Sequence, residues 1–360
     1  MYPQSLIDLS ELAPEELQGI LSLADEIKQN PRRYFGACEG KILATLFYEP
    51  STRTQMSFQT AMLRLGGQVI GFSDPMNSSV SKGESLADTI RIVSGYADIL
   101  AMRHPKEGAA KAAALYTKCP IINAGDGGHM HPTQTLTDLV TIFGEKQTLS
   151  GLTIGICGDL KNGRTVHSLV KTLCHSGNKF IFISTPELGL PSYILRLLAA
   201  CGCDCEFIPS LDEALPMLDV LYMTRIQKER FTSEELYESQ RDIYVLDAKK
   251  LERAKRDLIV LHPLPRVDEI TYEVDDDPRA LYFHQAECGV YARMALIMKM
   301  LERHGERDRL IGVSGKPCRN HNCITTVEPY LAASYKPDVN APDGDRLLCE
   351  YCDFSHRIEK

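Results

Sequence analysis

The segment "FYEPSTRT", residues 47–54, combines residue types that bind phosphate. An apolar strand-like run ends here, a proline turns the chain, and a helix is predicted to begin. The first turn of a helix offers backbone N–H groups without intrahelical partners and the positive end of the helix dipole. Ser51, Thr52 and Thr54 add hydroxyl donors. Arg53 adds a guanidinium that can hold two phosphate oxygens. From the residues alone, an ordinary N-cap beside a surface arginine stays open as an alternative.

Other polar side chains of the first half follow predicted strands or begin predicted helices. Arg103 ends an apolar run, at the carboxyl edge where parallel α/β sheets bind ligands. His131 and Gln134 lie three residues apart at the start of a helix predicted over 132–145, so both can face one cleft. Lys82 lies in a loop rich in serine and glycine. Each has an ordinary structural explanation, but together they indicate a ligand with several negative charges.

The second half repeats this arrangement. "GDLKNGRTVHS" follows a strand and places Arg164 at a helix start. It lacks both the Lys-Ser/Thr ending of a P-loop and the GxGxxG fingerprint of dinucleotide sites. Arg225 and Gln227 follow a further strand. "LHPLPRVDEI" has prolines on both sides of Leu264, and such a stiff turn can present backbone carbonyls as fixed acceptors.

Strand-like and helical segments alternate from residue 41 to residue 303, which predicts parallel sheets covered by helices. The fold class expected is α/β, with two parallel-sheet domains and a small C-terminal four-cysteine zinc domain. The boundaries expected are 1–135 for the first domain, 136–286 for the second, 287–303 for a closing helix that packs back on the first, 304–314 for a linker and 315–360 for the zinc domain.

Composition limits the class of protein. The 360 residues carry a net charge of −8 and 44% apolar residues, so no global attraction to nucleic acid or to an anionic membrane is expected. No run of 18 apolar residues predicts a membrane span. The first residues are polar and acidic, unlike a signal peptide, and most of the 12 cysteines are scattered. These features predict a cytoplasmic protein.

Two close cysteine pairs mark the tail. Cys318 and Cys323 are separated by four residues, and Cys349 and Cys352 by two. Four thiolates make a closed tetrahedral zinc site, with His321 as a competing ligand. From residue 315 onward there are six Lys/Arg and seven Asp/Glu, so a basic footprint for nucleic acid is absent.

A third cluster, "CGCDC", holds Cys201, Cys203 and Cys205 at alternate positions, which would share one face of a strand. With no histidine or second pair beside them in the sequence, these thiols are interpreted as structural.

Seven motifs together resemble the catalytic chains of aspartate carbamoyltransferases, over roughly residues 1–305. In order, they are "FYEPSTRT", "SKGES", "MRHP", "HPTQ", "GDLKNGRTVHS", "LYMTRIQKER" and "HPLPRVDEI". The resemblance implies the carbamoyltransferase fold and transfer of the carbamoyl group of carbamoyl phosphate to L-aspartate. The products are N-carbamoyl-L-aspartate and phosphate, in pyrimidine biosynthesis, with no cofactor for catalysis.

The resemblance also implies roles for single residues. Phosphate would be held by Ser51, Thr52, Arg53 and Thr54. The carbamoyl group would be contacted by Thr54, Arg103, His131 and Gln134. The carboxylates of aspartate would be bound by Arg164, Arg225 and Gln227. The backbone carbonyls of Pro263 and Leu264 would accept from amines.

In the family, a serine and a lysine of the "SKGES" loop enter the site of a neighbouring subunit, which implies a homotrimer at minimum. Lys82 matches the lysine and would contact both substrates. The serine is Ser78 by its offset from the lysine, with Ser79 as the alternative.

The tail resembles the zinc domain of the family's regulatory chain, fused here to the catalytic chain. In the family this domain docks on catalytic subunits, so a role in assembly beyond the trimer is expected. The nucleotide-binding domain of the regulatory chain has no counterpart.

Two other functions stay open. An ornithine carbamoyltransferase shares the fold, but Lys82 and the His-Pro-Leu-Pro turn match the aspartate type, and Arg164 and Arg225 would repel a cationic substrate. A zinc-containing binding protein without activity is the other, and the intact site motifs argue against it.

Overall fold

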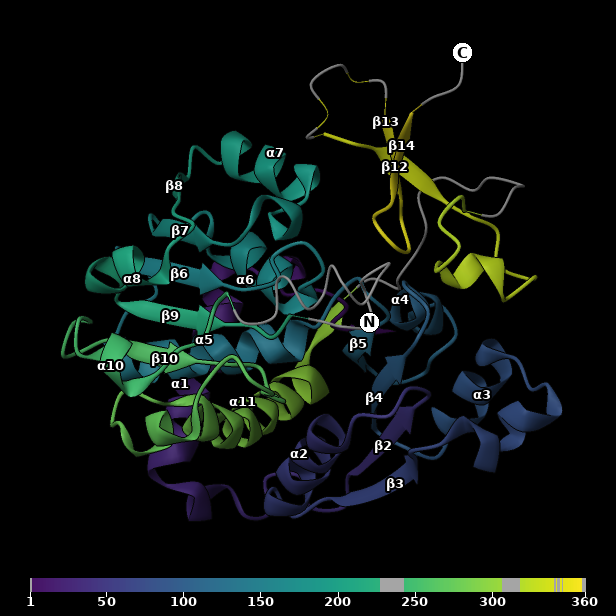
Figure 1. Ribbon diagram of the computed structural model, residues 1–360. Coiled ribbons are helices and arrows are strands. Elements are labelled where there is room, and N and C mark those ends of the chain that lie inside the picture. The colour runs from purple at the N-terminus through teal and green to yellow at the C-terminus, as the bar shows by residue number, and fades with distance from the viewer. Residues whose placement is uncertain are drawn as a thin grey trace. The chain divides into compact units, whose positions relative to one another are not determined.

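The structure is a computed structural model that describes residues 2–226, 243–305, 318–339, 341, 344 and 346–357. The chain forms two compact units (Figure 1). The first unit comprises Met1–Leu136 and Gly289–Lys360, and the second comprises Thr137–Cys288.

The first unit contains a parallel four-stranded sheet with the order β3-β2-β4-β5. Its strands are β2 (Ile42–Phe47), β3 (Gln68–Phe72), β4 (Ile99–His104) and β5 (Ile121–Asp126). In the register of the sheet, Phe47 lies opposite Arg103, so the ends of β2 and β4 meet at one edge. The two polar segments that follow these strands are therefore neighbours.

The helices of the first unit alternate with its strands along the chain. They are α1 (Pro14–Gln29), α2 (Thr52–Arg64), α3 (Leu86–Val93), α4 (Ala109–Ala114) and the start of α5 (Pro132–Lys146). Helix α2 packs on β2 and β3, and α4 packs on β4 and β5 (Figure 1). Buried Leu43 and Leu46 of β2 and Phe58 of α2 belong to the apolar interior.

The second unit contains a parallel five-stranded sheet with the order β10-β9-β6-β7-β8. Its strands are β6 (Thr153–Cys157), β7 (Lys179–Ile183), β8 (Asp204–Phe207), β9 (Val220–Met223) and β10 (Ile259–Leu261). Its helices are α6 (Arg164–Leu173), α7 (Ser192–Ala200), α8 (Leu211–Ala214) and α10 (Ala248–Leu251). Two parallel α/β sheets were expected from the sequence, and that expectation is confirmed.

Two expectations for single segments were wrong. The closing helix α11 (Tyr282–Glu302) begins at Tyr282, earlier than the predicted Glu287. Strand β8 begins only at Asp204, so Cys201, Cys203 and Cys205 do not share one face of a strand. Cys201 instead ends α7, because Gly202 takes a positive φ and turns the chain.

Short elements complete the chain. Strand β1 (Tyr2–Pro3) pairs with β11 (His304–Gly305), at the start of the predicted linker. The remainder of that linker lies outside the described residues. The 3-10 helices are Leu9–Glu11, Pro31–Tyr34, Pro75–Asn77, Ser79–Lys82, Pro186–Leu188, Leu215–Met217, Tyr272–Asp276 and Ile324–Thr326. Within the described ranges, no helix is both long enough and apolar enough to cross a membrane.

The tail forms an antiparallel sheet of β12 (Tyr335–Pro337), β13 (Arg346–Cys349) and β14 (Ser355–Arg357). Ile324, Leu331 and Tyr351 of the tail are buried in one apolar cluster with Leu86 and Ile90 of α3. The tail and the first domain therefore share a core.

Candidate active site and metal centre

The start of α2 leaves its N-cap hydroxyl turned away from the helix backbone. Ser51 occupies the N-cap position, but its side chain makes no capping hydrogen bond to the helix. Its hydroxyl donates instead to Oγ1 of buried Thr54, at 3.0 Å. Arg53 is exposed, and partial burial lowers the pKa of its guanidinium. The first turn thus keeps N–H groups, hydroxyls and a cation together, as an oxyanion ligand requires.

Arg103, at the end of β4, is buried among polar partners. Its Nη2 lies 2.9 Å from Oε2 of Glu49, and its Nη1 lies 3.3 Å from Nε2 of His131. Glu49 precedes α2 and His131 precedes α5, so three connections at the sheet edge converge on one guanidinium. Gly125 makes room for it: a Cβ on Gly125 would lie 2.9 Å from Arg103 Nη1.

Gln134 extends the same edge, because it lies in the first turn of α5 and is half-buried. The motifs therefore bring Thr54, Arg103, His131 and Gln134 to neighbouring connections of one sheet. Sequence reasoning missed Glu49, although it lies within the segment "FYEPSTRT", and Gly125, which lies outside every quoted motif.

The loop between β3 and α3 presents Lys82 to solvent. Ser79–Lys82 form a 3-10 helix, and Gly83 ends it with φ +89°. The hydroxyl of half-buried Ser78 donates to the carbonyl oxygen of Pro75, at 2.7 Å, whereas Ser79 is exposed. An exposed lysine on a short ordered turn can reach a neighbouring molecule.

In the second unit, Arg164 and Arg225 follow adjacent strands. Arg164 begins α6 after β6, and Arg225 comes two residues after β9. Gly158 and Thr224 lie so close that a Cβ on Gly158 would be 2.2 Å from the carbonyl oxygen of Thr224. Glycine at position 158 therefore allows the segments that follow β6 and β9 to pack closely. Gln227, the third residue expected to bind aspartate, lies outside the described residues.

A buried hydrogen bond between His262 and Glu269 supports the turn that carries Pro263 and Leu264. Leu264 has φ +54°, a left-handed conformation that is unfavourable for leucine. Its N–H donates to Nδ1 of His262, at 2.7 Å, which leaves the hydrogen of His262 on Nε2 facing Oε1 of Glu269, also at 2.7 Å. Oε2 of Glu269 accepts from the N–H groups of Val267 and Asp268.

The environment of Glu269 favours its ionised form. Burial by itself raises the pKa of this carboxyl, but the hydrogen bonds from His262 and the backbone outweigh burial and lower the pKa. The charged carboxylate therefore stays in the interior and holds the turn through His262, Val267 and Asp268. No local pattern in the sequence indicates this role of Glu269.

A second network of buried hydrogen bonds also supports the turn after His262. The carboxylate of Asp138 accepts from the hydroxyl of Tyr222, at 3.0 Å, and from Nε2 of Gln285, at 2.6 Å. Oε1 of Gln285 in turn accepts from the N–H of His262, at 2.9 Å. Asp138, fully buried, thus connects β9 to the turn after β10.

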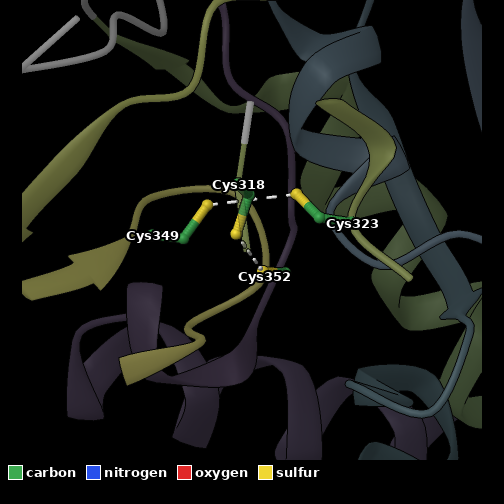
Figure 2. A group of neighbouring side chains, drawn as sticks. All are labelled: Cys318, Cys323, Cys349 and Cys352. Atoms are coloured by element: carbon green, nitrogen blue, oxygen red, sulfur yellow. Dashed lines mark hydrogen bonds between the residues drawn. The ribbon is translucent and has the colours of Figure 1, made fainter. Parts of the chain in front are cut away.

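Four buried cysteines form a second candidate site, in the tail (Figure 2). The sulfurs of Cys318, Cys323, Cys349 and Cys352 all lie within 4.8 Å of one another. His321, the competing ligand considered above, is exposed and does not belong to this group. Four close, buried sulfurs are the donor set of a closed structural metal site.

Polar groups around the sulfurs favour thiolates. The N–H of Asn320 points to Cys318 Sγ at 3.4 Å, and the hydroxyl of Thr325 points to Cys323 Sγ at 3.3 Å. Donors of this kind orient and tune metal-bound thiolates. The arrangement can therefore bind a metal ion.

The tail docks on the segments of the first domain that follow its site residues. Backbone hydrogen bonds of 2.9 Å join Glu107 N–H to Asn322 and Ile324 N–H to Glu107. The carboxylate of Glu107 also accepts from Nδ2 of Asn320, at 2.6 Å. A Cβ on Gly108 would lie 2.6 Å from Tyr351, so only glycine allows this approach.

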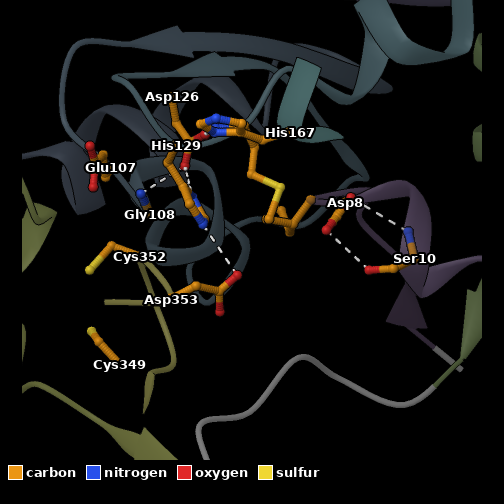
Figure 3. A network of polar contacts seen from close by, with 12 residues as sticks. Asp8, Ser10, Glu107, Gly108, Asp126, His129, His167, Cys349, Cys352 and Asp353 are labelled. Atoms are coloured by element: carbon orange, nitrogen blue, oxygen red, sulfur yellow. Dashed lines mark hydrogen bonds and ion pairs between the residues drawn. The ribbon is translucent and has the colours of Figure 1, made fainter. Parts of the chain in front are cut away.

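A histidine between two carboxylates adds to the same interface (Figure 3). His129 Nδ1 lies 3.2 Å from Asp126 Oδ2, and its Nε2 lies 3.2 Å from Asp353 Oδ2 of the tail. Further along, Oε1 of Glu328 and the hydroxyl of Tyr330 accept from the first N–H groups of α3. The tail thus caps the helix that follows the Lys82 loop.

Two family descriptions match the chain. "Aspartate/ornithine carbamoyltransferase, carbamoyl-P binding domain" matches residues 4–143, and "Aspartate/ornithine carbamoyltransferase, Asp/Orn binding domain" matches residues 150–300. Both matches end before the four-cysteine tail.

Individual proteins agree with these matches. The chain is 59% identical over 300 residues to the aspartate carbamoyltransferase catalytic subunit of Clostridium botulinum, which covers 83% of this chain and 98% of that protein. It is 60% identical over 298 residues to the corresponding subunit of Clostridium perfringens, over 82% of this chain and 97% of that one.

Solved structures show the same similarity. The catalytic subunit of M. jannaschii aspartate transcarbamoylase has 49% identity and a TM-score of 0.79, over 83% of this chain and 98% of that one. Aspartate transcarbamoylase from Trypanosoma cruzi in complex with carbamoyl aspartate and phosphate has 37% identity and a TM-score of 0.77, over 83% and 96%. The chain therefore belongs to the aspartate/ornithine carbamoyltransferase family, and these similar proteins are its aspartate-type catalytic subunits.

Proposed function

We propose that this chain transfers the carbamoyl group of carbamoyl phosphate to the amine of L-aspartate, giving N-carbamoyl-L-aspartate and phosphate for pyrimidine biosynthesis. The observation that supports this most is the buried Arg103 guanidinium, held by Glu49 and His131 at the same sheet edge as the start of α2. Solved relatives from Trypanosoma cruzi carry carbamoyl phosphate and aspartate in complex.

The first unit would hold carbamoyl phosphate. The N–H groups of α2 with Ser51, Thr52 and Arg53 bind the phosphate oxygens. Thr54, Arg103 and His131 surround the carbamoyl oxygen, and Gln134 contacts the carbamoyl amide. Because Arg103 is buried and already oriented, its charge acts without rearrangement when negative charge grows on that oxygen.

The second unit would hold aspartate. Arg164, Arg225 and Gln227 bind its carboxylates, and the carbonyls of Pro263 and Leu264 accept hydrogen bonds from the amine. The amine nitrogen then forms the C–N bond, and the carbonyl oxygen becomes an oxyanion. When the C–O bond to phosphate breaks, the oxyanion returns to a carbonyl and the leaving phosphate takes the proton of the amine. Positioning and charge stabilisation supply the rate increase, with no covalent nucleophile.

Phosphate release separates this function from its alternatives. The purified chain is given carbamoyl phosphate with L-aspartate, with L-ornithine, or with neither. We expect phosphate release above background only in the mixture that contains both carbamoyl phosphate and L-aspartate. Release with ornithine would assign the chain to the other branch of the family, and no release under any condition would favour a binding protein.

The active form would be a homotrimer at minimum. Lys82 is exposed on the loop after β3 and would enter the site of a neighbouring chain, together with Ser78 or Ser79. Mixing chains that carry Lys82→Ala with chains that carry His131→Ala tests this. Shared sites restore activity to the mixture, because some sites then receive both intact residues, whereas sites within single chains stay inactive.

The four tail cysteines would hold structural zinc, and the tail would support assembly beyond the trimer. A tail of about 46 residues is too small for an independent core, so metal would supply much of its folding energy. Metal analysis of the purified chain tests the identity of the ion, and the assembly size before and after chelation tests the role. The scattered free cysteines fit a reducing compartment such as the cytoplasm.

A further inference from the structure

Three metal-binding side chains meet in the second unit, far from the tail cysteines in sequence. Cys174 ends α6 and Cys201 ends α7, and their sulfurs lie 3.3 Å apart. Nε2 of His175 lies 3.5 Å from the sulfur of Cys201. All three ligand atoms lie within 4.8 Å of one another, as close as the four sulfurs of the tail.

The cluster is open on one side. Cys174 is buried and Cys201 is half-buried, whereas His175 is exposed. An ion can therefore enter past the imidazole and reach both sulfurs. Cys203 lies close by, but its sulfur faces the carbonyl oxygen of Asn178 at 3.7 Å and does not belong to the group.

The fold favours a cation at this point. The C-terminal ends of α6 and α7 both point here, and the carbonyl end of a helix carries partial negative charge. The sulfur of Cys174 lies 3.3 Å from the carbonyl oxygen of Lys171 in the last turn of α6.

We propose that Cys174, His175 and Cys201 form a second metal site, which takes a thiophilic divalent ion such as Zn²⁺. Two thiolates and one imidazole supply three ligands, and solvent supplies the fourth. The ion displaces the thiol protons on binding. This site ties the end of α6 to the end of α7 and does not depend on the function proposed above.

A disulfide between Cys174 and Cys201 is the competing use of the same pair. A metal ion brings its own positive charge and stabilises the thiolates it binds. The third donor, His175, has a place in a metal site and none in a disulfide.

The test counts metal ions bound per chain. The full-length protein is reduced, equilibrated with Zn²⁺, desalted and analysed for metal by mass spectrometry. We expect two ions per wild-type chain and one per Cys174→Ser, Cys201→Ser double variant. Cys205→Ser, a half-buried thiol on the neighbouring strand, is the matched control and keeps two.

A second variant, His175→Ala, tests whether the double variant loses metal only because it misfolds. The His175 side chain is exposed, so its removal should not disturb folding. It should weaken Zn²⁺ binding at this site at least tenfold, with an unchanged thermal midpoint in metal-free buffer. The double variant should bind one ion fewer than the wild type, and an equal count in the two proteins overturns the proposal. The proposal also fails if the freshly purified wild-type protein carries a disulfide between Cys174 and Cys201 and binds no second ion once that disulfide is reduced.

Discussion

His129 of the first domain and Asp353 of the tail form a polar bridge, with Nε2 and Oδ2 3.2 Å apart, and Asp126 holds the other ring nitrogen. Burial disfavours a charged imidazole, but the two carboxylates outweigh burial and raise the pKa of His129 to about 10 from its ordinary 6.5. Folding therefore favours the protonated ring.

The sign of the pH effect follows. Below pH 6.5 the ring is charged in both the folded and the unfolded chain, and its contribution to stability is fully present. As the pH rises from 6.5 through about 10, the folded state must give up a favourable proton and the contribution is lost. His129→Gln should lower the thermal midpoint by a few degrees at pH 6 and by much less near pH 10.

His321→Gln is the control for this measurement, because His321 is an exposed tail histidine. Its midpoint should follow the wild type at both pH values. An equal loss at pH 6 and pH 10 in His129→Gln would show that the ring acts by packing and not by charge.

Much of the fold could be predicted from the sequence because local patterns determine it. The run from Ile42 to Phe47 is apolar and buried, and a polar segment follows it, so strand and helix start could be located without the structure. The four tail cysteines were found in the same way, because metal-ligand spacing is local.

The supporting residues could not be predicted, because their partners lie far away in the chain. Asp138 and Gln285 are 147 positions apart, and Glu107 and Asn320 are 213 apart. A single carboxylate carries no periodic signal, and only the tertiary fold shows which donors surround it. The site at Cys201 was missed for the same reason, since its partners come from another helix.

The contact between the tail and α3 predicts a local effect of metal removal. The hydroxyl of Tyr330 accepts from the N–H of Ala87, at 2.9 Å, and Glu328 accepts from that of Leu86. Chelation should release both, so amide hydrogen exchange at Leu86 and Ala87 should rise at least tenfold. Burial of Ile324 and Leu331 in the shared core is worth about 1.5–3 kcal/mol each, so unfolding should also become easier.

Tyr330→Phe separates the hydrogen bond from the docking. It should raise exchange at Ala87 while metal content stays the same. Tyr96→Phe, at an exposed tyrosine after α3, is the control and should raise exchange at neither amide. Unchanged exchange at both amides after metal removal would contradict a capping role for the tail.

Removal of Glu49 should loosen the guanidinium that it holds. Glu49→Gln breaks the 2.9 Å ion pair with Arg103, and we expect kcat to fall about tenfold. His131→Ala removes the hydrogen-bond partner that we propose for the carbamoyl oxygen and should cost roughly 10²–10³ in kcat. Arg103→Ala should cost more, because it also leaves the Glu49 carboxylate without its cation.

Steady-state rates with saturating substrates measure these losses, and exposed Glu39→Gln is the control. If His131→Ala and Arg103→Ala lost equal activity, His131 would have to act as more than a hydrogen-bond partner.

Glu269→Gln should weaken the binding of aspartate and leave the binding of carbamoyl phosphate unchanged. The amide cannot replace a carboxylate that accepts from His262, Val267 and Asp268 together, so the turn at Leu264 should relax. We expect the KM for aspartate to rise about tenfold with little change in the KM for carbamoyl phosphate. Asp268→Asn, an exposed neighbouring carboxylate, is the control, and equal effects on both KM values would show general damage.

Gly125→Ala tests whether the position of Arg103 limits catalysis. A Cβ here would lie 2.9 Å from Nη1 of Arg103, so the guanidinium must move. Gly36→Ala is the matched control, because Gly36 also has a positive φ, +101° against +125°, but has no atom within 4 Å of the new Cβ. Both variants carry a backbone cost of about 1–3 kcal/mol. Only Gly125→Ala should lower kcat, by at least tenfold. Similar kcat values in the two variants would mean that catalysis tolerates a displaced Arg103 guanidinium.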